Sequence, residues 1–321
     1  MKKLHKSQII SKLVAATPLT TISLLMRNFI ANFVRILGIC KDFAGNRVNE
    51  HGNVRRCGVV PKFSDLEVVA LAITAEAFGF DSENLLFHRL HHDCKDDLPN
   101  LISRRQFNAR RKLTARLAEE IRKEVAVAKD VFCIDSKPVK VCRNVRAKRC
   151  AMGRDNIEAA PDWGYCASQG SHYYGYKLHA VCGIRGVIHS YDMTAASVHD
   201  IHYLNDVRWE YHDCMMLGDK GYLSAEIQKN LFELANISLE VPYRLNQKNR
   251  HLPTWEYRRF RKRIETIFSQ LNDNLMMIRN YAKQSCGLFT RMAGKIAALT
   301  FMQYVNFVNH RPIGKIKYSL I

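Results

Sequence analysis

The sequence predicts an α/β protein in which a mixed five-stranded sheet with flanking helices follows a helical N-terminal region. Two observations predict this class. Up to about residue 128, apolar residues recur at helical spacing, whereas after Asp130 short β-rich runs alternate with helical segments. The order of three strands, helix, strand, helix, strand and helix is typical of a mixed α/β sheet. At 321 residues, the chain has room for two domains.

Residues 1–62 have weak periodicity, and we interpret them as a helical or linker region. Their apolar stretch from Val14 to Met26 resembles the core of a signal peptide, but Pro18 interrupts it and no small-residue cleavage site follows. Arg27 and Arg35 then break any span of the roughly 20 apolar residues that a membrane helix needs. We therefore expect a soluble, cytoplasmic protein.

Three helices are predicted in residues 63–128. The first begins at the capping box Ser64-Asp-Leu-Glu67, and the second spans Ser82 to His92. The third opens at Ser103 and runs to about Val127. Its cations are Arg104, Arg105, Arg110, Arg111 and Lys112. Such a basic third helix fits a helix-turn-helix that binds DNA. It fits equally a helical bundle with a solvated basic face.

The part after Asp130 supplies the sheet. Gly183 and Gly186 mark a hairpin between the second and third strands. We expect strands at Val131–Asp135, Tyr173–Cys182, Val187–Ala195, Cys214–Asp219 and Leu239–Tyr243, and helices at Ser197–Val207, Ser224–Asn236 and Trp255–Asn280.

The charge balance points to an anionic partner. The formal net charge is +19, and a field of this breadth suits a polyanion, because neutralised phosphates release counterions. Solubility alone is the alternative explanation. The ten cysteines are scattered and include no C-x-x-C pair, which argues against a disulfide framework or a zinc ribbon. We assign the cluster His88, His91, His92 and Cys94 to a polar helix face or loop rather than to a metal site.

Three acids are candidates for chemistry. Asp135 and Asp219 each end an apolar strand, where side chains leave the core while the backbone stays rigid. Glu265 lies on the shoulder of the buried face of the last predicted helix. Clustered carboxylates repel one another unless a cation neutralises them. Mg²⁺ suits such a cluster, because it takes oxygen ligands and keeps positions free for water and phosphate.

Four motifs carry a family resemblance. They are Phe132-Cys-Ile-Asp-Ser-Lys-Pro138, Tyr174-Gly-Tyr-Lys-Leu-His179, Leu217-Gly-Asp-Lys-Gly-Tyr222 and Arg263-Ile-Glu-Thr266. In this order, they resemble the DDE insertion-sequence transposases, and most closely the insertion-sequence 982 family. The resemblance spans about residues 64–308. The acids are spaced by 219 − 135 = 84 and 265 − 219 = 46 residues, which fits that layout.

The resemblance implies an RNase H-like catalytic domain over residues 129–310, between a helical region at 63–128 and a basic tail at 311–321. It implies that Asp135, Asp219 and Glu265 are catalytic residues and metal ligands for two Mg²⁺ ions, with Mn²⁺ as a substitute. It also implies hydrolytic nicking at the terminal repeats of the element, followed by attack of the freed 3′-hydroxyl on double-stranded target DNA. Because two ends must be paired, we expect a homodimer or higher multimer on DNA, and no membrane partner.

One departure from the family pattern concerns the third acid. Related transposases carry a Tyr-x2-Arg-x3-Glu-x6-Lys signature. Here Arg261 and Glu265 fit it, but Arg258 occupies the Tyr position and Asn272 the Lys position. The roles of those two positions in the family are therefore not carried over.

Basic residues around the acids are expected to contact DNA, since phosphate contacts fix the register of a protein on DNA. The alternative for any of these charge runs is a solvated face. Near the last helix, Trp255 is a candidate for stacking on bases, whereas Phe260 fits the core, and His179 fits a packed histidine as well as a site residue. The predicted DNA-binding residues are Lys137, Lys140, Arg143, Arg146, Lys148, Arg149, Lys177, Lys220, Arg258, Arg259, Arg261 and Lys262, together with Arg104, Arg105, Arg110 and Arg111.

Two other functions fit the same sequence. A metal-dependent nuclease of the same fold would use the same acids to cut DNA without joining it. A catalytically inactive DNA-binding repressor would keep the basic surface without needing the three acids.

Overall fold

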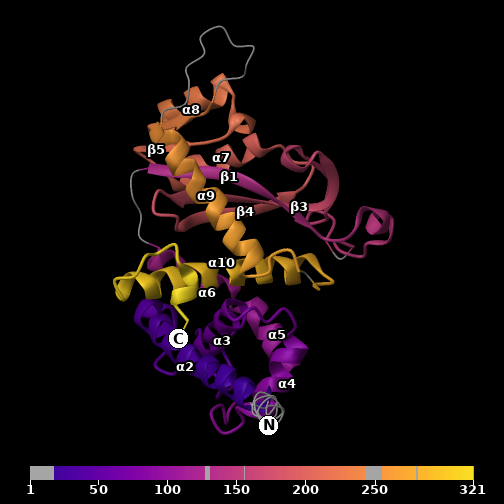
Figure 1. The fold of residues 1–321 in the computed structure, drawn as a ribbon, viewed down its shortest axis with the longest axis vertical. Helices are drawn as coiled ribbons and strands as arrows, with labels where there is room; N and C mark the ends of the chain where they lie inside the picture. Colours follow the sequence, from indigo (N-terminus) through magenta and orange to yellow (C-terminus); the bar gives the residue numbers. More distant parts are fainter. Residues whose placement is uncertain (1–17, 127–130, 155, 243–254, 280, 321) are drawn as a thin grey trace, which may run out of the picture.

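The computed structural model describes residues 18–126, 131–154, 156–242, 255–279 and 281–320. Residues 1–17 of the predicted N-terminal region lie outside these ranges, and so do Val127, Tyr243 and Asn280, which end predicted elements. Figure 1 shows a helical part below and a sheet with its helices above, with α10 (Ser285–Val308) running between them.

The helical part is built around one buried helix. Nearly every residue of α3 is buried, because α2 packs on one side of it and α10 on another. The predicted capping box begins this helix, with the Ser64 hydroxyl accepting a hydrogen bond from the Glu67 amide at 3.2 Å. The helices are α2 (Pro18–Ala44), α3 (Asp65–Ala77), α4 (Glu83–Asp93), α5 (Arg104–Leu113) and α6 (Ala115–Val125), and a short turn, η1 (Gly45–Arg47), follows α2.

The prediction of one helix from Ser103 to Val127 is wrong. Thr114 ends α5 and begins α6 with φ −91° and ψ 5°, and its hydroxyl donates to the Arg110 carbonyl at 2.9 Å. The break lets the two short helices bury separate faces, with Phe107 of α5 and Ile121 of α6 both fully buried.

Among the described residues, the sheet has six strands rather than the predicted five. They are β1 (Val131–Lys140), β2 (Asp162–Cys166), β3 (Ser171–Gly183), β4 (Ile188–Ala195), β5 (Cys214–Leu217) and β6 (Ile237–Glu240). The main order is β2-β3-β1-β5-β6, and β4 also pairs with β3. β3 is antiparallel to β1, β2 and β4, whereas β1, β5 and β6 are parallel. This mixed sheet with flanking helices confirms the expected RNase H-like fold. The strand that the sequence did not predict is β2.

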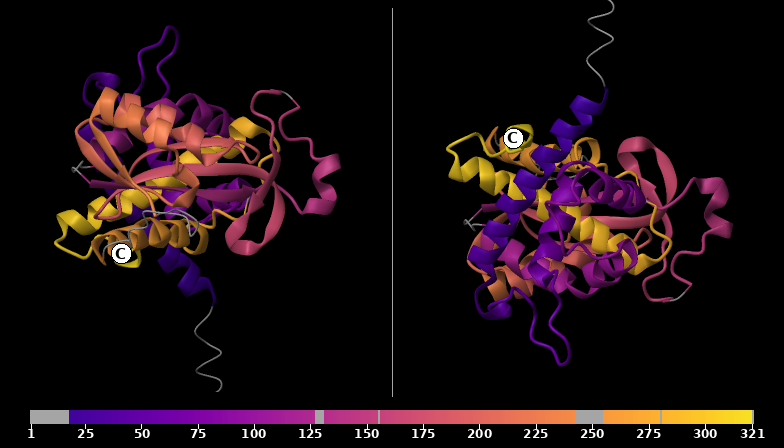
Figure 2. Two further views of the ribbon diagram at one scale, coloured as in Figure 1. Left: turned by 90° about the horizontal axis from the view of Figure 1, so that it is seen from above. Right: turned by 90° about the horizontal axis from the view of Figure 1, so that it is seen from below.

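Helices cover both faces of the sheet (Figures 1 and 2). On one face, α7 (Leu204–Glu210) and α8 (Ala225–Ala235) bury Ile134 and Val181. On the other, α9 (Trp255–Asp273) and α10 bury Leu178 and Cys182. Two helix predictions need correction. The one predicted at 197–207 starts as the short turn η4 (Asp200–Tyr203) and continues to Glu210, and α9 ends at Asp273 rather than near residue 280.

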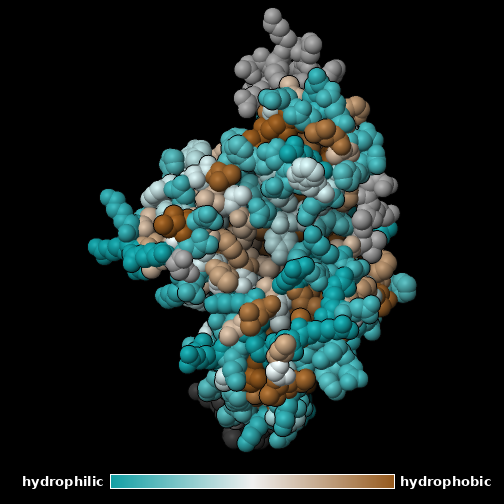
Figure 3. Space-filling model, turned by 180° about the vertical axis from the view of Figure 1, so that it is seen from behind, coloured by the Kyte–Doolittle hydropathy of each residue, from teal (hydrophilic) through white to brown (hydrophobic). Residues whose placement is uncertain are grey.

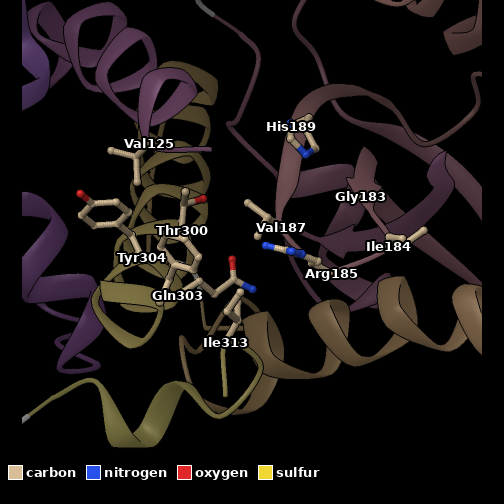
Figure 4. Close-up of a pocket in the computed structure, with 11 residues that line it drawn as sticks. Val125, Gly183, Ile184, Arg185, Val187, His189, Thr300, Gln303, Tyr304 and Ile313 are labelled. Carbon is tan, nitrogen blue, oxygen red and sulfur yellow. The ribbon is translucent and has the colours of Figure 1, made fainter. Parts of the chain in front are cut away.

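Polar contacts join the helical part to the sheet. The buried Arg122 of α6 donates to the carbonyl oxygens of Ile188 and His189 in β4, both at 2.6 Å. Gln303 of α10 donates to the Gly186 carbonyl at 2.6 Å. Figure 4 shows Gln303 on one side of a largely apolar pocket at this junction and Val187 of the β3–β4 turn on the other. Because buried residues of both parts form one continuous core, α10 supports the sheet and the helical part together.

A long arm leaves the end of the sheet at residues 141–175. It comprises the basic turn η2 (Asn144–Arg149), β2, the turn η3 (Ala167–Gln169) and the beginning of β3. The arm projects to the right in Figures 1 and 2 and to the left in Figure 3, where its side chains are mostly hydrophilic. None of the described helices combines the length and the apolar character needed to cross a bilayer.

Candidate active site

Two of the predicted acids, Asp135 and Asp219, lie near each other where β5 ends beside β1. β1 and β5 run parallel, and their register pairs Cys133 with Leu217, two residues before Asp135 and Asp219 respectively. Asp135 lies in the middle of β1, which continues to Lys140 instead of ending at Asp135 as predicted, whereas β5 ends at Leu217. The two aspartates therefore lie near each other where β1 extends past the carboxyl end of β5. The alternation of apolar residues that buries both strands also fixes this register, because a one-residue slip would turn the core side chains outward.

Local hydrogen bonds orient both carboxylates. Asp135 Oδ1 accepts the backbone amide of Ser136 at 2.8 Å. Asp219 lies at the start of the short turn η5 (Lys220–Tyr222), and its Oδ1 accepts the amide of Gly221 at 2.8 Å. Each aspartate thereby commits one oxygen to its own backbone. The second oxygen of Asp135 faces Arg261.

Helix α9 is fixed to both strands by polar contacts. Arg261 Nη2 lies 3.3 Å from Asp135 Oδ2, and Nη1 donates to the Ile134 carbonyl at 3.1 Å. One turn earlier, the Tyr257 hydroxyl donates to the carbonyl of Gly218, the residue before Asp219. The first turns of α9 therefore lie directly over the two aspartates.

The electrostatics of Asp135 favour a bound cation. Burial raises the pKa of its carboxyl to about 6, and the charges of Asp219 and Asp200 push the pKa in the same direction, whereas Arg261 opposes them. A carboxylate held under these conditions gains stability from any further positive charge that binds nearby.

Glu265 lies on the same helix one turn beyond Arg261. Residues four apart share one side of a helix, so Glu265 is on the side of α9 that carries the contact to Asp135. Its side chain is exposed and makes no hydrogen bond or ion pair with any described residue. No contact among the described residues joins Glu265 to Asp135 or Asp219.

The structure adds a fourth acid, Asp200, which the sequence analysis did not select. Asp200 Oδ1 accepts a hydrogen bond from Lys177 Nζ at 2.9 Å. A Cβ built on Gly221 would lie 3.0 Å from Asp219 Oδ1 and 3.5 Å from Asp200 Oδ2, so both carboxylates border the same small space. The sequence offered a hint of this, because Asp200 comes shortly after the strand predicted to end at Ala195.

Buried polar atoms near these acids lack partners. The Tyr222 hydroxyl and His179 Nδ1 are both fully buried and have no hydrogen-bond partner among the described residues. Burial raises the pKa of Tyr222 well above its usual range, and the charges of Asp200, Asp135 and Asp219 add to that effect. Burial lowers the pKa of His179 to about 4. The neutral ring of His179 stacks on Tyr203, which supports its interpretation as a packed histidine.

The donor set fits a divalent cation of the Mg²⁺ type. Mg²⁺ typically takes one or two carboxylates and completes its shell with water and phosphate oxygens. Asp135 and Asp219 supply that number, and the raised pKa of Asp135 is relieved by a cation. Within the described ranges, no group of three or more His, Cys, Asp or Glu side chains is placed to hold a metal ion together, so Asp135, Asp219 and Glu265 do not form one cluster in this structure.

The predicted DNA-binding cations fall into two sets. In the first, the charge is already engaged by protein groups: Arg110 by Asp65, Arg111 by Glu76, Lys177 by Asp200 and Arg261 by Asp135. The second set is exposed apart from the half-buried Lys137, and consists of Arg104, Arg105, Lys137, Lys140, Arg143, Arg146, Lys148, Arg149, Lys220, Arg258, Arg259 and Lys262. Trp255 is also exposed and lies under the guanidinium of Arg259. Phe260 is half-buried against the core.

Comparison with known proteins gives one family. The family model described as "Transposase DDE domain" matches residues 127–301, which is more than half of the chain. No curated protein and no solved structure matches the chain. The matched region contains β1 through most of α10, and with them Asp135, Asp219 and Glu265.

Proposed function

Because the chain belongs to the DDE transposase family, we propose that it binds the ends of its own insertion sequence and catalyses Mg²⁺-dependent strand cleavage and strand transfer. In this proposal, Asp135, Asp219 and Glu265 are the catalytic acids. The observation that carries it is the position of Asp135 on β1 near Asp219, which follows the parallel strand β5, together with the raised pKa of Asp135, about 6.

Each side chain has a role in this proposal. Asp135 and Asp219 hold the metal through the oxygens that their own backbones leave open. Glu265 completes the ligand set from α9, and Arg261 fixes the carboxylate of Asp135. Bound Mg²⁺, or Mn²⁺ in its place, would neutralise the acids, activate the attacking water or 3′-hydroxyl, and stabilise the leaving oxygen.

The acids repel the phosphates of DNA. In this proposal, the exposed cations supply the attraction that overcomes this repulsion. Lys220 follows Asp219 directly and is exposed, so it is placed to hold a phosphate next to the reacting one. The cations at the start of α9 and on η2 extend this basic surface to either side. Their phosphate contacts would make binding strongly dependent on salt.

Several finer assignments complete the proposal. We place the chain in the insertion-sequence 982 family, acting on DNA in the cytoplasm as a homodimer or higher multimer. We divide it into an N-terminal region at 1–62, a helical DNA-binding region at 63–128, the catalytic domain at 129–310 and a basic tail at 311–321. Helix α10 packs against α3 and α6, so the second and third of these regions are joined by a shared core.

A joining assay separates this function from its two alternatives. The substrate is a supercoiled plasmid that carries the two ends of the element with their flanking DNA, incubated with the full-length protein and Mg²⁺ or with EDTA. A transposase produces nicks at the ends and then products in which a 3′-end is joined to target DNA, in Mg²⁺ only. Cleavage without joined products would indicate a nuclease. Binding of the ends without cleavage would indicate an inactive DNA-binding protein.

A further inference from the structure

The projecting arm carries an exposed row of aromatic rings. β2 and β3 pair Trp163 with Tyr174 and Tyr165 with His172 as direct cross-strand neighbours. The ring centroids of the first pair are 5.5 Å apart and those of the second 5.0 Å. Trp163 is 44% exposed and Tyr165 56% exposed. We call these four side chains the aromatic ladder.

The hairpin that bears the ladder is held firmly from its other face. Cys166 and Tyr173 point to that face and are buried together with Ala196, which follows β4. Gly164 allows this close packing, because a Cβ at that position would lie 2.6 Å from the Ala196 carbonyl oxygen. The exposure of the ladder is therefore a property of a packed hairpin.

A basic turn is fixed beside the ladder. Asn144 of η2 donates to the His172 carbonyl at 2.8 Å, and the amide of Val141 donates to the Tyr174 carbonyl at 3.1 Å. These two bonds hold η2 against the strand that carries half of the ladder. The exposed cations of this segment are Arg143, Arg146, Lys148 and Arg149, and no acid occurs between residues 137 and 154.

The ladder lies on the same face of the sheet as the candidate active site. Asp135 pairs directly with Ala180, so their side chains share a face. Ala180 and Tyr174 are six residues apart on β3, an even number, so the ladder is on that face too. Six residues of strand span about 20 Å. Tyr176 and Leu178, which lie between Ala180 and Tyr174 on this face, are buried against α9 and α10, so a DNA strand that reaches both places passes beside these helices.

We propose that the aromatic ladder binds unpaired bases of the DNA strand that leads away from the cleavage site, while the cations of η2 hold its phosphates. Aromatic side chains stack on bases whose faces are open, and in a duplex the neighbouring base pairs already cover those faces. The adjacent cations match the charge of a nucleic acid rather than that of an apolar protein surface. This inference rests on the proposed function, because it uses the proposed cleavage site as its reference point.

Tryptophan fluorescence tests the proposal directly. The chain has three tryptophans, so the variant Trp209→Phe/Trp255→Phe leaves Trp163 as the only one. This protein is titrated in EDTA, where no cleavage occurs, with a short single strand, with the same sequence as a blunt duplex, and with an abasic strand of equal length. We expect the single strand to quench Trp163 and the duplex and abasic strands to leave it unquenched.

Affinity measurements provide the matched comparison. In the otherwise unchanged protein, Trp163→Ala should weaken binding of the single strand by about 5- to 150-fold, the range for loss of one stacked base. Trp209→Ala, which removes an exposed ring on α7, should leave the affinity unchanged. Equal loss in both variants, or quenching by the abasic strand, would overturn the proposal.

The two proposals fail in different ways. If the wild-type protein cleaves and joins DNA but Trp163 is not quenched by the single strand, the ladder does not bind bases and the transposase function stands. If Trp163 is quenched but no cleavage occurs in Mg²⁺, the ladder binds bases and the proposed catalysis is wrong.

Discussion

The guanidinium of Arg261 bridges the carboxylate of Asp135 and the carbonyl of Ile134, at 3.3 Å and 3.1 Å. This contact fixes helix α9 over the middle of β1 and partly offsets the effect of burial, which raises the pKa of Asp135. It also sets the position of Glu265, which is one turn further along the same helix. The geometry of the proposed site therefore depends on Arg261 as well as on the acids.

Replacing Arg261 with lysine should reduce cleavage while the fold is kept. A single ammonium cannot reproduce the two-pronged contact of a guanidinium. A hydrogen bond to a charged group contributes about 1.5–3 kcal/mol, so we expect cleavage to fall by about 10- to 150-fold. Arg263→Lys, on the exposed side of the same helix, is the control and should cleave at the wild-type rate. Similar rates for Arg261→Lys and wild type would show that the bridge is dispensable.

The ion pair between Lys177 and Asp200 should be important for stability. Both side chains are largely buried, at 14% and 22% exposure, so Asp200→Asn leaves a nearly buried ammonium without its counter-charge. We expect that change to lower the free energy of unfolding by about 1.5–3 kcal/mol. The double variant Asp200→Asn/Lys177→Met should recover most of the loss, because no unpaired charge remains. Chemical denaturation gives the free energy of unfolding of the wild type, the single variant and the double variant. A double variant that is less stable than the single one would contradict this expectation.

The buried Glu76 makes stability depend on pH in the acid range. Burial alone would raise its pKa, but the positive charges of Arg111, Lys295 and Arg291 outweigh burial and hold the pKa at about 2. A carboxyl whose pKa is lowered on folding stabilises the protein above its unfolded pKa, and the contribution is lost as the pH falls toward the folded value. Glu76→Gln should therefore cost about 3–5 kcal/mol at pH 7.

The pH profile provides the check on Glu76. The gap in unfolding free energy between wild type and Glu76→Gln should narrow as the pH falls from about 4.5 toward 2. Glu226→Gln, an exposed acid on α8, is the control and should differ little from wild type at any pH. A gap for Glu76→Gln that stays constant down to pH 2 would show that the pKa of Glu76 is not lowered.

The role of Glu265 can be tested on its own helix. Glu265→Gln is nearly isosteric and removes one negative charge, so we expect cleavage to collapse while DNA binding persists. Asp273→Asn removes a charge from an exposed acid two turns later on α9 and should cleave normally. Mg²⁺-dependent nicking and a binding assay on the same DNA measure both effects. Equal cleavage by Glu265→Gln and wild type would make Glu265 a structural residue.

The sequence predicts those features that a few neighbouring residues determine, such as an apolar strand or the start of a helix. Asp135 and Asp219 could be placed together because each comes at the end of an apolar run of residues, although β1 itself continues beyond Asp135 to Lys140. Ser64 marks a helix start through its capping box. β2 was missed because Asp162–Cys166 is short, with Trp163 and Tyr165 exposed on one face and glycine between them. The break at Thr114 was missed because threonine gives only a weak signal against a continuous helical pattern.

Ion pairs between residues far apart in the chain explain why several of the predicted DNA-binding cations are engaged within the protein. Arg110 and Arg111 follow a helical basic pattern, but their partners are Asp65 and Glu76, which are 45 and 35 residues earlier in the chain. Lys177 meets Asp200 across 23 residues. Ion pairs at such separations leave no periodic signal in a single sequence, so the engaged cations could not be distinguished from those that are free to contact phosphate.

The most direct test of the proposed active site compares two aspartates at opposite ends of β5. Asp219 follows the strand beside Asp135, whereas Asp213 precedes it, is exposed, and has a positive φ of 49° that asparagine also tolerates. Asp219→Asn and Asp213→Asn each remove one charge, and each is assayed for Mg²⁺-dependent cleavage of the plasmid with element ends and for binding to those ends. We predict that Asp219→Asn binds DNA but does not cleave it, and that Asp213→Asn does both. Undiminished cleavage by Asp219→Asn would show that Asp219 is not part of the active site.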